Sequence, residues 1–196
     1  MTSATASFYN RIAFMYPIID VFLKPQKRNL VGEVNAYPPG RLLEIGVGTG
    51  RHLRNYRKHS IVGVDISQTM LNYALRNNPN NAILLQMDGE SLIFGDETFD
   101  YVVLSHVLAV TANADRLLEE VRRVLVPGGT LFILNHFTPE NWVRYIDNGF
   151  ALFSGRFHFR SAFRVEDLSA LKAFKLMKDA SVSPLSYFRL LVYTKP

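Results

Sequence analysis

Five short apolar runs recur between residues 41 and 135, and turn-rich or amphipathic segments separate them. Apolar runs without alternating polar positions are typical of strands that are buried on both faces. The strands are expected at residues 41–45, 61–64, 82–86, 99–104 and 130–135. Because strands that alternate with helices form parallel sheets with helices on both faces, the pattern predicts an α/β, doubly wound fold.

Helices are expected between these strands. One is expected over residues 67–76, where the first residue is a serine that can cap it, and another near residues 50–58. The segment 114–125 has the clearest helical pattern, because its apolar residues recur on one face. We also expect Glu119 of this helix to pair with Arg123 one turn later.

The length of 196 residues favours a single domain with three parts. Residues 1–40 form an N-terminal helical cap, residues 41–136 form the core that carries the ligand site, and residues 137–196 form a lid segment and the last strands. Those strands are expected at 172–178 and 186–194 as an antiparallel hairpin. The prediction is therefore a mostly parallel, seven-stranded sheet with an antiparallel C-terminal hairpin.

The composition excludes several classes of protein. The chain has no cysteine, so we expect no disulfide framework, no cysteine nucleophile and no thiolate zinc site. No metal-binding residues are predicted. No apolar run reaches the length of about 18 residues that a membrane-spanning helix requires. Residues 1–7 lack the features of a signal peptide. These observations favour a cytoplasmic protein.

A glycine-rich segment, Glu44–Gly50, follows the first strand. Its glycines allow the backbone to approach a ligand, and free N–H groups are expected to face that ligand. A dinucleotide fingerprint would require glycine at the position of Arg51. Glu44 would repel a phosphate but can hold a cationic amino group through bridging water. The candidate binding residues are Glu44, Gly46, Gly48 and Gly50; the alternative is a tight turn without a ligand.

Two further carboxylates follow strands at the edge where ligands bind in parallel sheets. Asp65 can accept hydrogen bonds from both hydroxyls of a ribose, or it can be an acid that favours the start of a helix. Asp88 can accept from an adenine amino group while the Gly89 N–H donates to the ring, although Asp-Gly is also a common turn. Ile66 and Met70 can flank the adenine or belong to the core.

These features combine with later motifs into a longer pattern. In chain order it consists of E-x-G-x-G-x-G at 44–50, Asp65, D-x-E-x-L-x-F at 88–94, Phe99-Asp100 and L-x-P-G-G at 125–129. Over residues 8–140 the sequence resembles class I S-adenosylmethionine-dependent methyltransferases of the quinone and phospholipid type. The resemblance implies a Rossmann-like fold and S-adenosylmethionine as cofactor, with its methionine, ribose and adenine moieties at the first motif, Asp65 and Asp88. Ser105, which ends the fourth strand, is included in the predicted cofactor site.

Two histidines follow the fourth and fifth strands. His106 lies in a Ser-His-Val segment and His136 in an Asn-His-Phe segment, and both are similar to bacterial phosphatidylethanolamine N-methyltransferases. An amine acceptor must lose a proton before it attacks a methyl group. Either histidine can take that proton, because imidazole titrates near neutral pH. The alternative for each is a structural hydrogen bond.

Two tyrosines near the N-terminus, Tyr9 and Tyr16, match the motif Y-D-x-x-A-x-x-Y-D that many relatives carry on a helix over the cofactor. Their spacing places them on one helical face. They are candidates for positioning the amine, with packing in an amphipathic core as the alternative. Asn10 and Pro17 replace the aspartates of the motif, so this chain lacks those carboxylates.

The net charge of +5 comes from the two ends of the chain. Residues 8–23 mix aromatic and aliphatic side chains and precede Lys24, Lys27 and Arg28, as in an interfacial helix. Residues 150–164 interleave phenylalanines with arginines, which can contact acyl chains and lipid phosphates. Peripheral contact with an anionic membrane at its inner face is therefore expected. One alternative is a lid over a hydrophobic acceptor. Aromatic and basic residues can also bind nucleic acid by stacking, but this is the least favoured alternative and no nucleic-acid partner is expected.

Three functions are compatible with the sequence. The favoured function is methyl transfer to the amine of phosphatidylethanolamine or a related phospholipid at a membrane surface. The second is methylation of a quinone or another small molecule. The third is a protein that binds S-adenosylmethionine without transferring its methyl group.

Overall fold

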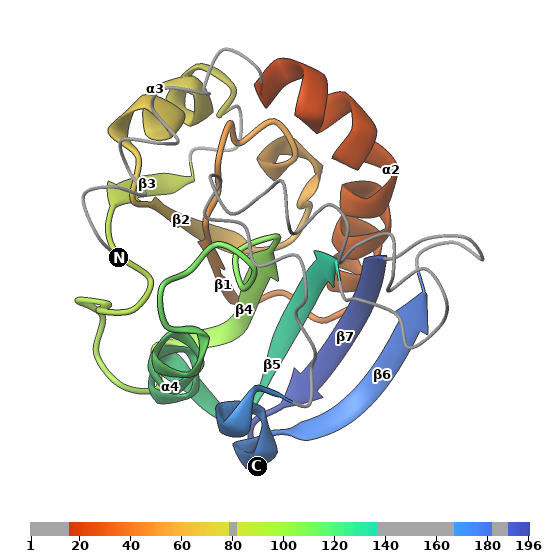
Figure 1. Cartoon of the computed structure of the whole chain (residues 1–196), viewed down its shortest axis with the longest axis vertical. Coiled ribbons are helices and arrows are strands. Elements are labelled where there is room, and N and C mark those ends of the chain that lie inside the picture. The colour runs from red at the N-terminus through yellow and green to blue at the C-terminus, as the bar shows by residue number, and fades with distance from the viewer. Residues whose placement is uncertain (1–15, 79–81, 137–166, 182–187) are drawn as a thin grey trace, which may run out of the picture.

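The computed structural model describes residues 16–78, 82–136, 167–181 and 188–196. Within them, the strands form one seven-stranded sheet in the order β3-β2-β1-β4-β5-β7-β6 (Figure 1). The strands are β1 (Arg41–Ile45), β2 (Ser60–Asp65), β3 (Ile83–Gln86), β4 (Phe99–Ser105), β5 (Leu125–His136), β6 (Lys175–Ser181) and β7 (Phe188–Thr194). Neighbours from β3 to β5 pair in parallel, whereas β7 pairs antiparallel with β5 and β6. The predicted fold class is confirmed.

Helices cover both faces of this sheet (Figure 1). The described helices are α2 (Tyr16–Asn35), α3 (Gln68–Arg76) and α4 (Ala114–Val124), together with the 3₁₀ helices η2 (Leu53–Asn55) and η4 (Ser169–Ala173). One face of the sheet packs against α2, η2 and α3, and the other packs against α4 and η4. Among these described helices, none is long and apolar enough to cross a membrane.

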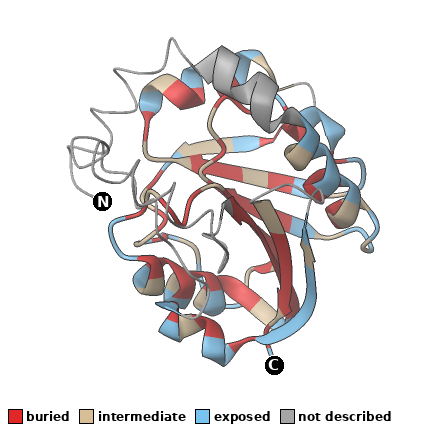
Figure 2. Cartoon of the chain, turned by 45° about the vertical axis from the view of Figure 1, so that its right-hand side comes forward, coloured by how far each residue is buried: buried red, intermediate tan, exposed pale blue. Residues whose placement is uncertain are grey.

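The core occupies both faces of the sheet, and Figure 2 shows the buried residues concentrated along the strands. Within β1, Leu43 and Ile45 belong to the cluster on the α4 face, whereas Leu42 belongs to the cluster on the α2 face. On that second face, Leu30 and Val34 of α2 are fully buried. Since consecutive strand residues point to opposite faces, an uninterrupted apolar run supplies both layers.

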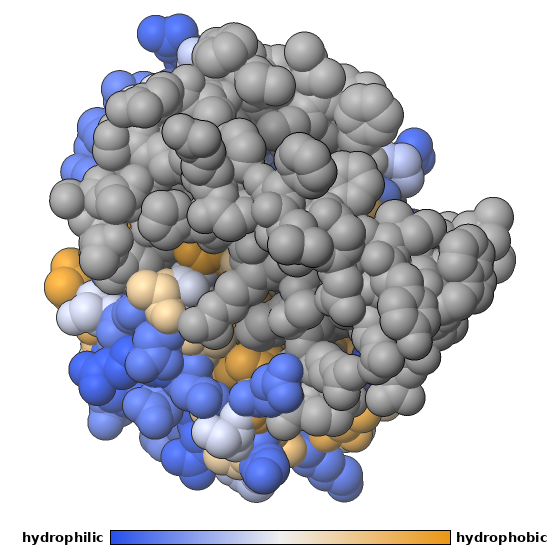
Figure 3. Space-filling view, in the orientation of Figure 1, coloured by the Kyte–Doolittle hydropathy of each residue, from blue (hydrophilic) through white to orange (hydrophobic). Residues whose placement is uncertain are grey.

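The helices α3 and α4 begin and pack as the sequence pattern predicts. The Ser67 hydroxyl caps α3 by accepting a hydrogen bond from the Met70 N–H at 3.3 Å. The Asn113 side chain caps α4 by accepting from the Arg116 N–H at 3.0 Å. Figure 3 shows hydrophilic residues gathered over α4, while its apolar stripe around Leu117 is buried against the sheet. This arrangement is that of an amphipathic helix on a sheet.

The helix expected near residues 50–58 is not formed, so that prediction was wrong. Only η2 is helical between β1 and β2, and its turn closes through a hydrogen bond from the Leu53 N–H to the Gly50 carbonyl at 3.0 Å. The helix α2 packs on the same face of the sheet and shares a hydrophobic cluster with Leu53 of η2. Its Asn35 side chain donates to the Asn55 carbonyl at 2.8 Å, which attaches α2 to the segment where a helix was expected.

The ion pair expected between Glu119 and Arg123 is replaced by another. Arg123 pairs with Glu120, with 2.8 Å between Nη2 and Oε2, and Glu119 is exposed. Glu120 also accepts a hydrogen bond from the Leu92 N–H at 2.7 Å, and Arg123 donates to the carbonyls of Leu92 and Phe94. Arg123 therefore pairs with Glu120 because both side chains also bind the connection between β3 and β4. The spacing of residues along one helix does not reveal such a contact.

Two differences concern the end of the chain. The strand expected at 172–178 begins later, as β6, because η4 occupies residues up to Ala173. The strand expected at 186–194 corresponds to β7 and pairs with β6 as predicted. Tyr9, the aromatic and basic segment 150–164 and the joint of the hairpin lie outside the described residues.

Candidate functional site

The carboxyl ends of the parallel strands meet at one edge of the sheet and bring most of the predicted site residues together. There lie Glu44–Gly50 beside β1, Asp65 at the end of β2, Asp88 after β3, Ser105 at the end of β4 and His136 at the end of β5. Ile45 pairs in register with both Val64 and Leu104, which aligns these ends. The strand order reverses at β1 and β4, where doubly wound sheets bind ligands.

The three glycines of the loop after β1 have positive φ angles, but they differ in their surroundings. The angles are +74°, +58° and +66° at Gly46, Gly48 and Gly50. A Cβ atom at Gly46 would overlap the Val107 side chain, and one at Gly50 would lie 2.8 Å from the Cβ of Ala74. A Cβ at Gly48 would meet no atom within 4 Å. Gly46 and Gly50 are therefore required by packing, whereas Gly48 faces open space.

The expectation of free N–H groups in this loop was wrong for most of its residues. The N–H groups of Gly46 and Val47 donate to the Val64 carbonyl at 2.8 and 3.0 Å. The Gly48 N–H donates to Asp65 Oδ2 at 2.8 Å, and the Gly50 N–H donates to the Val47 carbonyl. Because the expected helix is absent and these donors are already used, the loop is not a phosphate cradle.

Asp65 is held by the backbone on both sides. Its Oδ1 accepts from the Ser67 N–H at 2.9 Å, and its Oδ2 accepts from the Gly48 N–H at 2.8 Å. Burial raises the pKa of the Asp65 carboxyl, and the backbone donors partly oppose that shift. The Ile66 N–H is a third backbone donor to this carboxylate. Since an ionised carboxylate has about four acceptor positions, one remains for a ligand. Of its predicted neighbours, Ile66 is half-buried and Met70 is buried in the protein interior.

Glu44 is fully buried and bound to a histidine that the sequence pattern did not single out. His52 Nε2 lies 2.5 Å from Glu44 Oε1, and both side chains are buried. The other oxygen, Oε2, has no hydrogen-bond partner among the described residues. Burial, followed by the nearby Glu44 carboxylate, raises the pKa of Tyr56 well above its ordinary value. The only signal for His52 and Tyr56 was that a buried carboxylate requires partners.

The turn after β3 is shaped by packing as well as by its predicted acid. Asp88 Oδ1 accepts from the Glu90 N–H at 3.0 Å, as in an Asx turn. A Cβ at Gly89 would lie 2.7 Å from the Ile45 side chain and 2.8 Å from that of Leu117. Only glycine therefore allows this turn to lie against β1 and α4.

Glu90 ties this turn to the segment that follows β4. Its Oε1 accepts hydrogen bonds from the Thr111 hydroxyl at 2.5 Å and from the N–H groups of Ala112 and Asn113 at 2.9 and 3.0 Å. The sequence placed Glu90 in a family motif but did not indicate this contact. The motif thus joins two of the loops at the candidate site.

His106 has an unusual backbone conformation at the end of β4. Its φ angle is +60°, its N–H donates to the Leu134 carbonyl at 2.8 Å, and its ring contacts Phe188 edge-on at 5.3 Å between centroids. A positive φ in a residue other than glycine is uncommon and is concentrated at functional sites. The preceding Ser105 is buried, and its Oγ has no hydrogen-bond partner within the described parts of the chain.

The other two predicted catalytic residues that the structure describes are placed by their backbone. His136 ends β5 and pairs in register with Phe188, the residue that the His106 ring contacts. The two histidines are therefore brought to neighbouring strands at the same edge. Tyr16 is the first residue of α2.

Comparison with known proteins matches residues 43–133 to a family described as "Methyltransferase domain". A phosphatidylethanolamine N-methyltransferase of Cereibacter sphaeroides is 31% identical over 176 residues, which cover 86% of this chain and 86% of that protein. A ubiquinone/menaquinone biosynthesis C-methyltransferase of Bordetella avium is 29% identical over 142 residues, or 66% of this chain and 56% of that protein.

Solved structures share the fold at lower identity. The structure of a SAM-dependent methyltransferase from Thermotoga maritima has a TM-score of 0.74 and 22% identity, and covers 98% of this chain and all of that one, 100%. At this identity the likeness concerns the fold alone. The sequence match over most of both chains, the matched domain and the strand order together identify the chain as a member of the class I S-adenosylmethionine-dependent methyltransferases.

Proposed function

We propose that this methyltransferase acts on the amine of phosphatidylethanolamine or a related phospholipid at a membrane surface. The observation that carries the proposal is the 31% identity to a phosphatidylethanolamine N-methyltransferase across 86% of both chains. The quinone C-methyltransferase matches less of this chain, 66%, and only 56% of its own length. An amine acceptor also agrees with the two histidines at the ends of neighbouring strands, because amine attack requires removal of a proton.

The family implies S-adenosylmethionine, which supplies an electrophilic methyl group on a sulfonium centre. The residues at the edge of the sheet fit this molecule. Glu44 has a buried oxygen without a partner among the described residues, which suits the ammonium group of the methionine moiety. Gly48 faces open space, and Asp65 keeps an acceptor position for a ribose hydroxyl beside its backbone donors. A loop with few free N–H donors disfavours phosphate-bearing nucleotides.

The remaining predicted cofactor residues have supporting roles in this proposal. Asp88 and the N–H of Gly89 would recognise the adenine, and Ile66 and Met70 would shape its pocket. Ser105 would donate a hydrogen bond from its hydroxyl to the cofactor, since its buried Oγ has no partner in the described parts of the chain. Gly46 and Gly50 act through packing, which holds the loop against Val107 and Ala74.

The acceptor would be activated by His106 or His136 and positioned by Tyr9 and Tyr16. The Leu134 carbonyl accepts from the N–H of His106, whose backbone is left-handed, and the His106 ring packs edge-on against Phe188. In-line transfer depends chiefly on alignment of the nucleophile with the methyl group, which a fixed ring favours. Contact of the basic segment 150–164 with lipid would bring the headgroup to this edge.

The test is incubation with S-adenosylmethionine labelled in its methyl group, using vesicles with phosphatidylethanolamine and, separately, a quinone with an unsubstituted ring position. We expect label in N-methylated lipid only. His106→Gln and His136→Gln should lower kcat and shift its pH profile. His59→Gln should not, because His59 precedes β2 at the edge of the sheet opposite the carboxyl ends of the strands. Labelled quinone without labelled lipid would overturn the proposed acceptor. Unchanged pH profiles of kcat in both histidine variants would overturn the proposed role of the histidines.

A further inference from the structure

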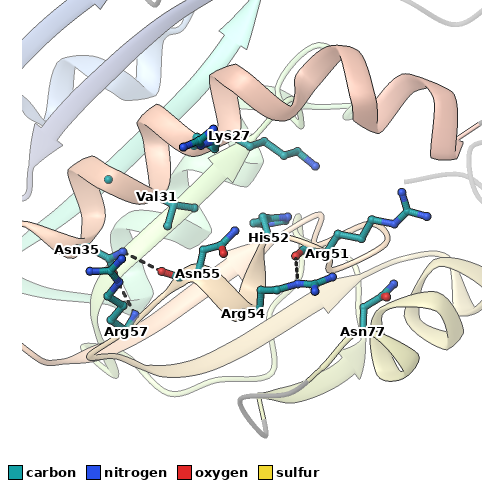
Figure 4. Close-up of a pocket in the computed structure, with 11 residues that line it drawn as sticks. Lys27, Val31, Asn35, Arg51, His52, Arg54, Asn55, Arg57 and Asn77 are labelled. Atoms are coloured by element: carbon teal, nitrogen blue, oxygen red, sulfur yellow. Dashed lines mark hydrogen bonds between the residues drawn. The ribbon is translucent and has the colours of Figure 1, made fainter.

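A groove of about 900 Å³ lies between α2 and the segment 51–57, on the sheet face opposite α4 (Figure 4). Its described lining includes five cationic side chains and no carboxylate. The cationic residues are Lys27, Arg28, Arg51, Arg54 and Arg57. We call this groove the "basic groove". The sequence pattern singled out Lys27 and Arg28 as the basic end of an expected interfacial helix, but it did not indicate that three arginines of the segment 51–57 would face them.

The charge of the groove is local rather than general. Residues 41–149 as a whole carry ten basic and twelve acidic residues, so arginines there are not in excess. Arg28, Arg51, Arg54 and Arg57 form no ion pair within the described residues. Like charges that converge without counter-charges repel one another, and a bound anion would relieve that repulsion.

The groove is built on fixed backbone. Arg51, Arg54 and Arg57 are three residues apart, which is the repeat of a 3₁₀ helix such as η2. Asn35 of α2 donates to the Asn55 carbonyl at 2.8 Å and accepts from the Arg57 N–H at 3.0 Å (Figure 4). His52, which also lines the groove, is held by Glu44. The cationic side chains therefore project from α2 and from the segment 51–57, and the hydrogen bonds of Asn35 hold these two parts together.

Gly32 adds room to the groove. It lies within α2 and lines the groove, and a Cβ at this position would meet no atom within 4 Å. Packing therefore does not require glycine here, although glycine inside a helix is less favourable than alanine. The space that it leaves adds to a groove whose volume is in the range of small-molecule sites.

From these observations we propose that the basic groove binds a phosphate-bearing ligand, either a soluble phosphate ester or the headgroup of an anionic lipid. Guanidinium groups bind phosphate oxygens in pairs, and several converging arginines suit a phosphate group better than a lone carboxylate. No Phe, Tyr or Trp is present among the described lining residues, so the groove offers no platform for stacked bases, and nucleic acid is disfavoured. The described lining shares no residue with the predicted cofactor site, although His52 contacts Glu44 of that site. The proposal does not rest on the identity of the methyl acceptor.

The experiment compares two triple variants of the full chain. The groove variant carries Arg51→Gln, Arg54→Gln and Arg57→Gln. The matched control carries Arg122→Gln, Lys172→Gln and Lys175→Gln, which removes the same charge from exposed positions on α4, η4 and β6. Arg54 donates a hydrogen bond to the Arg51 carbonyl, so its replacement also removes a contact within the protein. The single variants Arg51→Gln and Arg57→Gln, which keep that contact, are therefore measured as well.

Binding is measured by calorimetry with inorganic pyrophosphate and by cosedimentation with phosphatidylglycerol vesicles, each at low and at physiological salt. We expect the groove variant to lose at least about tenfold in affinity, each single variant a smaller part, and the control less than about twofold. Pyrophosphate binding alone assigns the groove to a soluble phosphate ester. Vesicle binding that pyrophosphate competes away assigns it to a lipid headgroup.

Four results would overturn the proposal. The first is that the unaltered protein binds neither probe, and the second is that the groove variant and the control lose equal affinity. The third is that the protein binds single-stranded RNA but not pyrophosphate. The fourth is that the groove variant loses tenfold in affinity for S-adenosylmethionine. The last would place the arginines in the cofactor site. S-adenosylmethionine binding and lipid methylation are measured on the same samples, so failure of the groove is distinguishable from failure of the proposed function.

Discussion

Nε2 of His52 lies 2.5 Å from Oε1 of Glu44, and both side chains are buried. Glu44 belongs to β1, whereas His52 directly precedes η2. The contact fixes one carboxylate oxygen and leaves the other, Oε2, without a hydrogen-bond partner in the described residues. The pair therefore links the proposed cofactor loop to the wall of the basic groove.

Removal of His52 is expected to leave a buried carboxylate without its partner. His52→Ala should lower the free energy of unfolding by about 1–3 kcal/mol, which is the usual effect of an unsatisfied buried polar group. Urea denaturation measures this change, and the double variant Glu44→Gln/His52→Ala should recover part of the loss. A change below about 0.5 kcal/mol for His52→Ala would show that the contact is not important for stability.

The Asp65 carboxyl should make cofactor binding depend on pH. Burial raises its pKa in the folded protein, so the folded state binds this proton more tightly than the unfolded chain does. Ionised Asp65 therefore destabilises the folded protein. The contribution of Asp65 to the free energy of unfolding becomes more favourable as the pH falls through its raised pKa.

Cofactor affinity should change in the opposite direction. The ribose hydroxyls would donate to ionised Asp65, so affinity for S-adenosylmethionine should fall as the pH drops through a pKa above the ordinary value of about 3.9. Calorimetry across that range measures the effect, and Asp65→Asn should weaken binding and remove the dependence. Identical pH profiles for the two proteins would contradict the ribose role.

Substitutions of the loop glycines should separate strain from packing. Gly48→Ala introduces a side chain at φ +58° with no atom within 4 Å, so only conformational strain of about 1–2 kcal/mol is expected. Gly50→Ala adds a clash with Ala74, whose Cα would lie 2.9 Å away, and should lose about 1–3 kcal/mol more. Thermal unfolding compares them, and equal losses would contradict the packing difference. Cofactor affinity should fall for Gly48→Ala, where the protein fold is least affected.

Glu90 should stabilise the two loops that it joins. Glu90→Ala removes an acceptor of three hydrogen bonds, from Thr111, Ala112 and Asn113, and should lower the free energy of unfolding by about 1–3 kcal/mol. Hydrogen exchange should be faster at the Ala112 and Asn113 amides. Glu119→Ala, on the exposed side of α4, is the control and should change stability by less than about 0.5 kcal/mol. Similar losses in both variants would show that the contact has no special role.

The sequence alone was sufficient for the strands, for α3 and α4, and for the residues at the strand ends. Leu43 and Ile45 signal a strand because apolar runs of this kind suit a sheet covered on both faces, and Ser67 signals the start of α3. The loop of Glu44–Gly50 was identified from its alternating glycines directly after a predicted strand, and these glycines have positive φ in the structure. These features arise between residues close in the chain or follow from the period of a strand or helix.

The tertiary structure decided which distant residues meet. Nothing in the local sequence shows that the segment after β1 forms only η2, that Arg123 selects Glu120 over Glu119, or that Glu90 contacts Thr111. The same holds for His52 beneath Glu44 and for the arginines that face α2 across the groove. Such contacts depend on how whole elements pack across the sheet, and many different partners satisfy the same local pattern of apolar and polar residues.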